Sequence, residues 1–310
     1  MAVRGMLAAM TWTETYRGAV NRWEVDNVDH FTVAYYFARF EDATLALLQA
    51  LGLGPDALGT RRAAIIAECR VRYLRELRVG DLLSIRSGVI SADESGLALG
   101  HEVVDAGDGA LCTTVEQRAV IVASDRRTPL PLSRAEQDLA LRHRVDWDSG
   151  PAPAAAKGPT DDARFIDAAR DTLKPWEVDT QGFAAPPAFI HRFSTANGHV
   201  LAAFGMTPAY MRSERRGFST FEFRLAFPGT LRAGDFVLVR SGLAHIGKSS
   251  IRILHRMTEA RTGALVATLD QSGVCLDLEA RRPAPLADDL RARAMGILVI
   301  PAAAGDRGSR

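Results

Sequence analysis

The sequence has few cysteines and no long apolar run. Its three cysteines, Cys69, Cys112 and Cys275, lie far apart among 310 residues. Because this spacing fits neither a disulfide framework nor a metal site, we interpret them as buried thiols. No apolar run approaches the roughly 18 residues that a membrane-spanning helix needs. The apolar region near the N-terminus is too short for a secretory signal. We therefore expect a cytoplasmic protein without a membrane partner.

The sequence also lacks an excess of charge of either sign. Its formal net charge at pH 7 is +1, so we expect no nucleic acid and no anionic membrane surface as the main partner. It contains no metal-ligand cluster, no phosphate-binding loop and no glycine-rich dinucleotide fingerprint. We therefore expect no bound metal and no cofactor. The apolar fraction of 47% is typical of a globular protein, and the length suffices for about one to three domains.

Residues 22–54 combine a polar segment with a long helix pattern. Within them, apolar residues recur at the three-and-four spacing of one helix face over 33–51. A helix of about 18 residues would be about 27 Å long, which suits the central helix of a domain. The polar knot that precedes the helix lies where free backbone N–H groups and the helix dipole favour negative charge. This polar knot contains Asp26, Asn27, Asp29 and His30.

Strand-like runs follow the helix pattern. Short turn clusters rich in Gly and Asp separate them, which favours antiparallel hairpins over crossover connections. A short helix comes next, with a capping box formed by Ser133 and Glu136. A segment rich in Pro, Ala and Gly over 146–160 has the composition of a linker. The predicted strands are 68–73, 82–90, 97–104 and 110–122.

The second half of the chain repeats the first. The letters WEVD at 23–26 recur at 176–179, an offset of 153 residues. After one inserted residue, identities continue across the whole half at an offset of 154, among them Arg-Ser-Gly at 86–88 and 240–242. These matches indicate two copies of one unit, made of a strand, a long helix and four antiparallel strands. One copy alone would leave an open sheet edge, so we expect the two copies to pair within the chain.

A long helix wrapped by an antiparallel sheet, with an Asp-x-x-x-His motif just before the helix, resembles the hotdog-fold thioesterases of acyl-CoA and acyl-ACP. Plant acyl-ACP thioesterases are similar in having a tryptophan, then an aspartate, a histidine four residues on and a tyrosine six beyond that. The matching positions here are Trp23, Asp26, His30 and Tyr36, with Trp23 one residue closer to Asp26 than in that pattern. Residues 75–81 (RELRVGD) also look like the family's turn between strands.

Two positions depart from the family pattern. Asp29 stands where the family often has a glycine before the histidine. Val28 stands where the plant enzymes have an asparagine, and Asn27 is displaced from that position by one residue.

The resemblance implies an α+β fold of two tandem hotdog units, paired as an intramolecular pseudo-dimer. Each unit is a long central helix wrapped by an antiparallel β-sheet. Whether the pseudo-dimer assembles further into a homo-oligomer stays open. The implied boundaries are an N-terminal hotdog at 1–145, a linker at 146–163, a C-terminal hotdog at 164–287 and a tail at 288–310.

Hydrolysis of a thioester needs a base or nucleophile, a group that polarises the carbonyl and space for the acyl chain. Asp26 suits the first role, either by activating water or by attacking the carbonyl, as is argued for family members. His30, at the positive end of a helix, favours its neutral form and can donate a hydrogen bond to the substrate or orient the carboxylate. A helix cap for Asp26 and a structural role for His30 are the alternatives.

Asn27, Tyr36 and Glu41 are the candidates for supporting contacts around this pair. For Tyr36 and Glu41 a structural role is favoured. His101 and His255 occupy equivalent strand positions in the two copies, which favours packing over chemistry.

The second copy keeps the aspartate of the knot, as Asp179, but loses the polar residues around it. We therefore hypothesise a single active site, carried by the first half. The replacements are Phe183 for His30, Gly182 for Asp29, Phe189 for Tyr36 and Ser194 for Glu41.

The leading hypothesis is hydrolysis of an acyl thioester of CoA or of acyl carrier protein, and that thioester is the expected partner molecule. The second is a hotdog 3-hydroxyacyl-thioester dehydratase or enoyl hydratase. It ranks lower because those enzymes resemble a pattern with a glycine four residues after the histidine. Here Ala34 stands at that position. The third is a non-catalytic protein that binds acyl thioesters.

Overall fold

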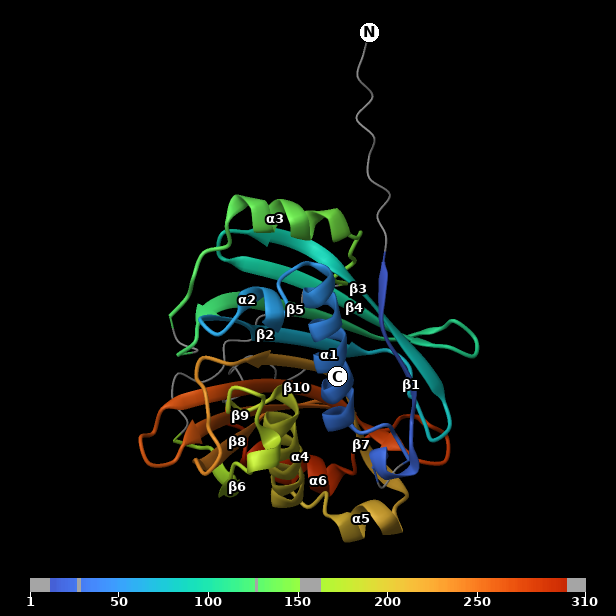
Figure 1. Ribbon diagram of the computed structural model, residues 1–310. Helices are drawn as coiled ribbons and strands as arrows, with labels where there is room; N and C mark the ends of the chain where they lie inside the picture. Colours follow the sequence, from blue (N-terminus) through green and yellow to red (C-terminus); the bar gives the residue numbers. More distant parts are fainter. Residues whose placement is uncertain (1–11, 27–28, 126–127, 151–162, 300–310) are drawn as a thin grey trace. The chain divides into compact units, whose positions relative to one another are not determined.

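The structure is a computed structural model that describes residues 12–26, 29–125, 128–150 and 163–299 (Figure 1). The chain divides into two units, Met1–Ala152 and Pro153–Arg310. Within the predicted linker, residues 151–162 lie outside the described part. Among the described residues, no helix is both long enough and apolar enough to cross a membrane.

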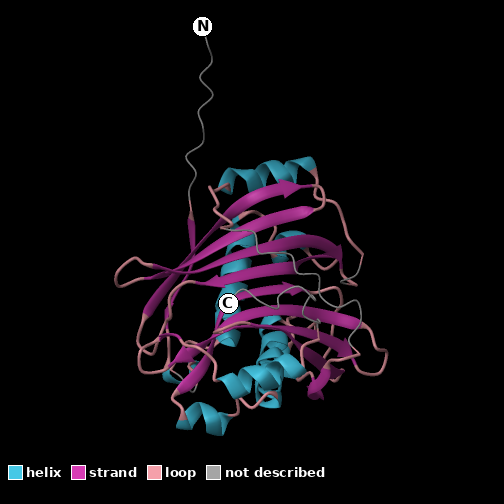
Figure 2. Ribbon diagram, turned by 180° about the vertical axis from the view of Figure 1, so that it is seen from behind, coloured by secondary structure: helices cyan, strands magenta, loops and turns pink. Residues whose placement is uncertain are grey.

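The first unit combines antiparallel strands with one long helix. Its elements are β1 (Thr13–Ala19), α1 (Val33–Ala50), α2 (Pro55–Leu58), β2 (Arg62–Tyr73), β3 (Leu82–Asp93), β4 (Gly96–Asp105), β5 (Leu111–Ala123) and α3 (Arg134–Ala140). The strand order is β1-β3-β4-β5-β2, and every neighbouring pair in it is antiparallel. Strands β2 to β5 pass behind α1 in Figure 1 and in front of it in Figure 2, so α1 covers one face of the sheet.

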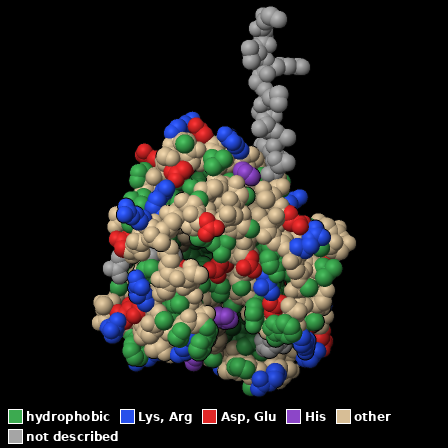
Figure 3. Space-filling view, in the orientation of Figure 1, with side chains coloured by type: hydrophobic (Ala, Val, Ile, Leu, Met, Phe, Trp, Pro, Cys, Tyr) green, Lys and Arg blue, Asp and Glu red, His purple; other side chains and the backbone are tan. Residues whose placement is uncertain are grey.

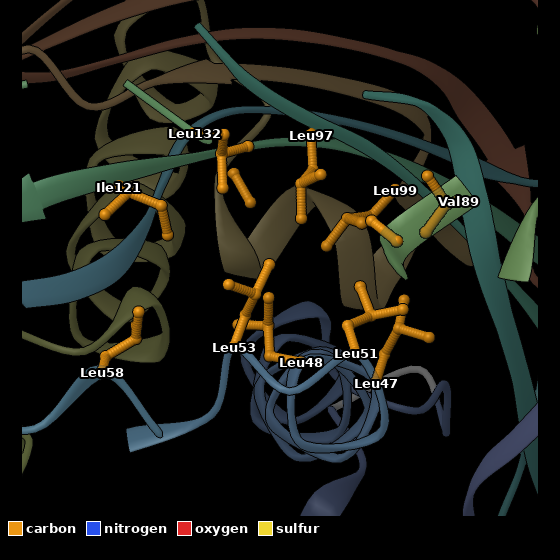
Figure 4. Close-up of a cluster of buried hydrophobic side chains, with 12 residues drawn as sticks. Leu47, Leu48, Leu51, Leu53, Leu58, Val89, Leu97, Leu99, Ile121 and Leu132 are labelled. Atoms are coloured by element: carbon orange, nitrogen blue, oxygen red, sulfur yellow. The ribbon is translucent and has the colours of Figure 1, made fainter. Parts of the chain in front are cut away.

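Helix α1 forms because its sequence carries one continuous apolar face. It spans 18 residues, as predicted, and its buried side chains include Phe40, Leu47 and Leu48. The leucines near its C-terminal end point at Leu97 and Leu99 of β4 (Figure 4). Each fully buried leucine contributes about 1.5–3 kcal/mol to stability. This packing fixes the helix on the sheet, and with it the loop that precedes the helix.

The second unit repeats this order. Its elements are β6 (Ile166–Thr172), α4 (Pro186–Ala203), α5 (Pro208–Ser213), β7 (Arg216–Ala226), β8 (Phe236–Ile246), β9 (Ser250–Glu259), β10 (Leu265–Asp277), β11 (Arg282–Pro283) and α6 (Asp288–Gly296). The strand order is β7-β10-β9-β8-β6, and β11 pairs with β10. Helix α4 begins 153 residues after α1, and β8 begins 154 residues after β3, so the predicted repeat is confirmed. Helix α6, in the predicted tail, begins 154 residues after α3.

The residues after α3 pack back onto the sheet of the first unit. The Val145 N–H donates to the Val89 carbonyl at 3.0 Å, and Trp147 Nε1 donates to Glu116 Oε1 at 2.7 Å. A Cβ at Gly100 would lie 2.5 Å from the Trp147 ring, so this close approach requires glycine. The first residues of the predicted linker are therefore packed against this unit.

Each unit buries a serine, a histidine and a glutamine in its core. The serine Oγ lies 2.7 Å from the histidine Nδ1 in both units, and the glutamine Oε1 lies 3.2 and 3.3 Å from Nε2. Burial lowers the pKa of both histidines to about 4, so both are neutral near pH 7. The residues are Ser87, His101 and Gln117 in the first unit and Ser241, His255 and Gln271 in the second.

Candidate functional site

In the polar knot before α1, two hydrogen bonds join Asp26 to His30. The Asp26 N–H donates to the His30 carbonyl at 2.9 Å, and the Asp26 carboxylate accepts the His30 N–H at 3.0 Å. Asp26 therefore stabilises this loop rather than capping α1, whose N-cap is Thr32. Asp26 is also exposed to solvent. Asn27, which was predicted to support the site, lies outside the described residues.

Asp29 takes a backbone conformation that favours glycine. Its φ is 65°, in the left-handed region, and the equivalent Gly182 of the second unit has a φ of 81°. An ion pair of 2.9 Å joins the Asp29 carboxylate to Arg22. Aspartate is one of the residues that tolerate the left-handed region, so the departure from the family pattern leaves the loop intact.

His30 pairs with a carboxylate that the sequence analysis did not identify. Its Nε2 lies 2.9 Å from Oε1 of Glu76, in the loop between β2 and β3. The two side chains are only 13% and 29% exposed, so water screens their interaction only in part. The backbone joins the same two loops, since the Phe31 N–H donates to the Leu77 carbonyl at 2.8 Å. The other carboxylate oxygen of Glu76 accepts a hydrogen bond from Arg78 at 3.1 Å.

Comparison of the two repeats in the sequence could have identified Glu76 as the partner of His30. Positions 30 and 76 correspond to Phe183 and Thr230 in the second unit, so both members of the pair change together. There, the Arg232 guanidinium lies 4.1 Å from the centre of the Phe183 ring. A cation–π contact thus stands where the first unit has its histidine and carboxylate.

A buried ion pair joins the residues just before the polar knot to α1. Glu24, which is 2% exposed, pairs with Arg39 of α1 and accepts a hydrogen bond from the Asn21 N–H at 2.8 Å. The second unit has the equivalent pair Glu177–Arg192, at 2.9 Å. This shared contact gives the glutamate of both WEVD segments the same structural role.

The other two predicted residues lie on α1. The Tyr36 ring is buried, 4.4 Å from the Phe31 ring and 5.2 Å from the Tyr73 ring. Burial raises the pKa of the Tyr36 phenol, so it stays protonated. Glu41 is half-buried and lies eight residues beyond Val33, about 12 Å along the helix. The structure therefore places Tyr36 against the residue that follows His30, and Glu41 farther along α1.

The cysteines are buried, and charged side chains of both signs lie on the surface (Figure 3). All three cysteines are free and buried, as predicted, and burial raises the pKa of the Cys69 and Cys112 thiols. Within the described ranges, no group of three or more His, Cys, Asp or Glu side chains is arranged to hold a metal ion. Basic and acidic side chains are interspersed over the face seen in Figure 3.

Comparison with known families matches each unit separately. The model of the thioesterase-like superfamily matches residues 20–145 and again 173–294. Among curated proteins, L-carnitine dehydrogenase/betainyl-CoA thioesterase of Agrobacterium fabrum is 29% identical over 134 residues, which are 43% of this chain and 27% of that protein. The chain thus spans about a quarter of that relative's length. The betainyl-CoA thioesterase of Pseudomonas aeruginosa is 30% identical over 139 residues, which are 42% of this chain and 86% of the relative.

A solved structure shows the same fold. The acyl-ACP thioesterase from Bacteroides thetaiotaomicron superposes with a TM-score of 0.64, covering 83% of this chain and 96% of the other. The sequence identity is 12%, so this similarity concerns the fold alone. Together with the two matched segments, it confirms the predicted α+β fold of two tandem hotdog units.

Proposed function

The chain belongs to the thioesterase-like superfamily, and from this membership we propose that it hydrolyses an acyl thioester, of CoA or of acyl carrier protein, to the free acid and the thiol. Both curated relatives carry betainyl-CoA thioesterase in their names, which favours CoA as the carrier. The active half is the predicted N-terminal hotdog at 1–145, because the C-terminal hotdog at 164–287 keeps the aspartate, as Asp179, but lacks the histidine and the glutamate.

The observation that carries the proposal is the contact between His30 and Glu76. The Glu76 carboxylate accepts the Nε2–H of His30, which puts the lone pair of the neutral ring on Nδ1. A carboxylate that selects the tautomer of a histidine and stabilises its protonated form prepares that histidine for acid–base catalysis. Phe183 and Thr230, at these positions in the second unit, carry no group that titrates near neutral pH.

In the proposed reaction, His30 acts as the base. Its Nδ1 takes a proton from a water molecule while the water oxygen bonds to the thioester carbonyl carbon. N–H groups in the first turn of α1 stabilise the oxyanion that forms. The C–S bond then breaks, and His30 returns the proton to the departing sulfur. The carbonyl carbon keeps the water oxygen, so the products are the acid and the thiol.

Asp26 acts on the same water. Its exposed carboxylate accepts a hydrogen bond from the water and adds negative charge beside the imidazolium that forms on His30. Direct attack of Asp26 on the carbonyl is the other route that its position allows. An aspartyl anhydride trapped on Asp26 with hydroxylamine would identify this second route.

The experiment that tests the proposed function measures free thiol released from acyl-CoA and acyl-ACP by the purified chain. Thiol release at a steady rate is the expected result. Loss or gain of enoyl absorbance without thiol release would indicate a dehydratase or hydratase, and binding without either change would indicate a binding protein.

A further inference from the structure

Three hydroxyl-bearing side chains meet in the core of the first unit. Tyr36, Tyr73 and Thr113 are named here the hydroxyl cluster. Tyr73 of β2 pairs with Thr113 of β5 across the two strands, and the Tyr36 ring lies 5.2 Å from the Tyr73 ring. Burial raises the pKa of Tyr36, and the nearby Thr113 hydroxyl opposes that rise.

The hydroxyl cluster adjoins the loops that carry His30 and Glu76. Phe31 directly follows His30, and its ring packs 4.4 Å from the ring of Tyr36. Tyr73 is the last residue of β2, three residues before Glu76. Two members of the cluster are therefore linked to the proposed reactive pair, one through each loop.

The second unit keeps the shape of the hydroxyl cluster without its hydroxyls. The equivalent positions hold Phe189, Phe227 and Ala267. The rings of Phe189 and Phe227 lie 5.1 Å apart at 63°, compared with 5.2 Å and 68° for Tyr36 and Tyr73. Because the same ring contact forms without a hydroxyl, packing does not account for the hydroxyls of the first unit.

Buried hydroxyls without good partners weaken a fold. Thr113 is 0% exposed, and its oxygen makes no hydrogen bond of standard geometry among the described residues. The hydroxyls and the His30–Glu76 pair are present together in the first unit, and the second unit lacks both. Their joint occurrence indicates a ligand that both sets of residues contact.

The core behind the hydroxyl cluster is unsuited to a long alkyl chain. Gln117 lies four residues beyond Thr113 on β5, about 13 Å away. Its Oε1 accepts a hydrogen bond from Thr44 at 2.7 Å and lies 3.2 Å from His101 Nε2. An alkyl chain at this depth would separate these buried groups without replacing their hydrogen bonds. Beyond them, packed leucines fill the space (Figure 4).

We propose that the hydroxyl cluster binds a polar substituent on a short acyl group, so that Tyr36, Tyr73 and Thr113 determine the acyl specificity of the site. This rests on the proposed thioesterase function and specifies its substrate class. Tyrosine and threonine hydroxyls both donate and accept hydrogen bonds, so they pair with a hydroxyl or carbonyl group on the acyl chain. An unsubstituted chain offers these hydroxyls no hydrogen bond, and a site built to bind a polar substituent discriminates against the analogue that lacks it.

The test compares 3-hydroxybutyryl-CoA with butyryl-CoA, which differ by one hydroxyl group. The full chain should hydrolyse the hydroxylated ester with a kcat/KM at least about tenfold higher. The triple variant Tyr36→Phe/Tyr73→Phe/Thr113→Ala carries the side chains of the second unit, and its ratio should fall to about one. The control Tyr210→Phe, in the second unit, should keep the original ratio. Equal kcat/KM values in the unsubstituted chain, or an unchanged ratio in the triple variant, would overturn the proposal.

Calorimetric titration with the same two esters separates this proposal from the proposed function. A preference in affinity for 3-hydroxybutyryl-CoA that the triple variant loses supports the hydroxyl cluster even without turnover. Absence of thiol release from any acyl-CoA or acyl-ACP contradicts the thioesterase function instead. Faster hydrolysis of octanoyl-CoA than of 3-hydroxybutyryl-CoA contradicts the short polar acyl group alone.

Discussion

His30 Nε2 lies 2.9 Å from Glu76 Oε1, across two loops that are far apart in the sequence. In the second unit, Phe183 and Thr230 occupy the two positions, so only the first unit has this histidine and carboxylate. The difference supports the hypothesis of one active site in the first half. Glu76 thus joins Asp26 and His30 as a third candidate residue. Its role depends on the fold, because its contact with His30 joins two loops that are far apart in the sequence.

Removal of the Glu76 charge should slow catalysis more than it weakens binding. Glu76→Gln keeps the size of the side chain and an oxygen that accepts the His30 Nε2–H, but it no longer stabilises the protonated ring. We expect kcat to fall about 100-fold or more, with KM within about threefold, in a thiol-release assay. Glu102→Gln is the matched control, since that carboxylate pairs with Arg86 on the sheet. An unchanged kcat for Glu76→Gln would exclude the assigned role.

Loss of the Arg39 guanidinium should destabilise the first unit. The Glu24 side chain is 3% exposed, so Arg39→Met leaves a buried carboxylate without its ion-pair partner. Such a loss costs about 3–5 kcal/mol, and we expect the low end because Arg39 is 19% exposed. Urea unfolding measures the change in the free energy of unfolding. Arg17→Met, which removes an exposed pair with Glu14, should cause no measurable change, and equal effects would contradict the argument.

Two buried histidines should make stability depend on pH. Burial lowers the pKa of His101 and of His255 from 6.5 to about 4. The unfolded chain therefore binds protons at these residues below about pH 6.5, whereas the folded chain binds them only below about pH 4. Their contribution to stability is complete above pH 6.5 and is lost as the pH falls toward 4. At about 1.4 kcal/mol per pKa unit, the loss at pH 4 is about 3 kcal/mol for each histidine.

Urea unfolding between pH 4 and 8 measures this dependence. His101→Gln should make the free energy of unfolding depend less steeply on pH in that window. The exposed His199 offers a control, because His199→Gln should leave the dependence unchanged. Parallel curves for all three proteins would show that the buried histidines do not titrate as described.

The long helix α1 and the repeat could be predicted because both depend on patterns that are visible in the sequence. The apolar period of α1 is regular over its whole length, so its bounds agree with the prediction to one residue. Strand β2 was predicted to begin at 68 but begins at Arg62. Its pairing with β5 shifts register between Ile66 and Glu68, and such an irregularity breaks the polar–apolar alternation that marks a strand.

The same distinction between local patterns and long-range contacts decides which reactive residues could be predicted. Asp26 and His30 lie four residues apart, so their spacing within one loop was visible in the sequence. Glu76 meets His30 only because Phe31 and Leu77 join the two loops, and no local pattern encodes that contact. The hydroxyl cluster likewise forms from three separate elements, so only comparison of the two units within the structure distinguishes it from ordinary aromatic packing.

A single active site in the first unit is tested most directly by a matched pair of substitutions, Asp26→Asn and Asp179→Asn. Each carboxylate accepts the N–H of the residue four positions on, at 3.0 Å from His30 and 3.1 Å from Phe183. Asparagine keeps an acceptor oxygen, so both variants preserve the loop and remove only the charge. In a thiol-release assay, we expect kcat to fall about 100-fold or more for Asp26→Asn and to stay unchanged for Asp179→Asn. Equal losses in the two variants, or an unchanged rate for Asp26→Asn, would contradict a single site built on Asp26 and His30.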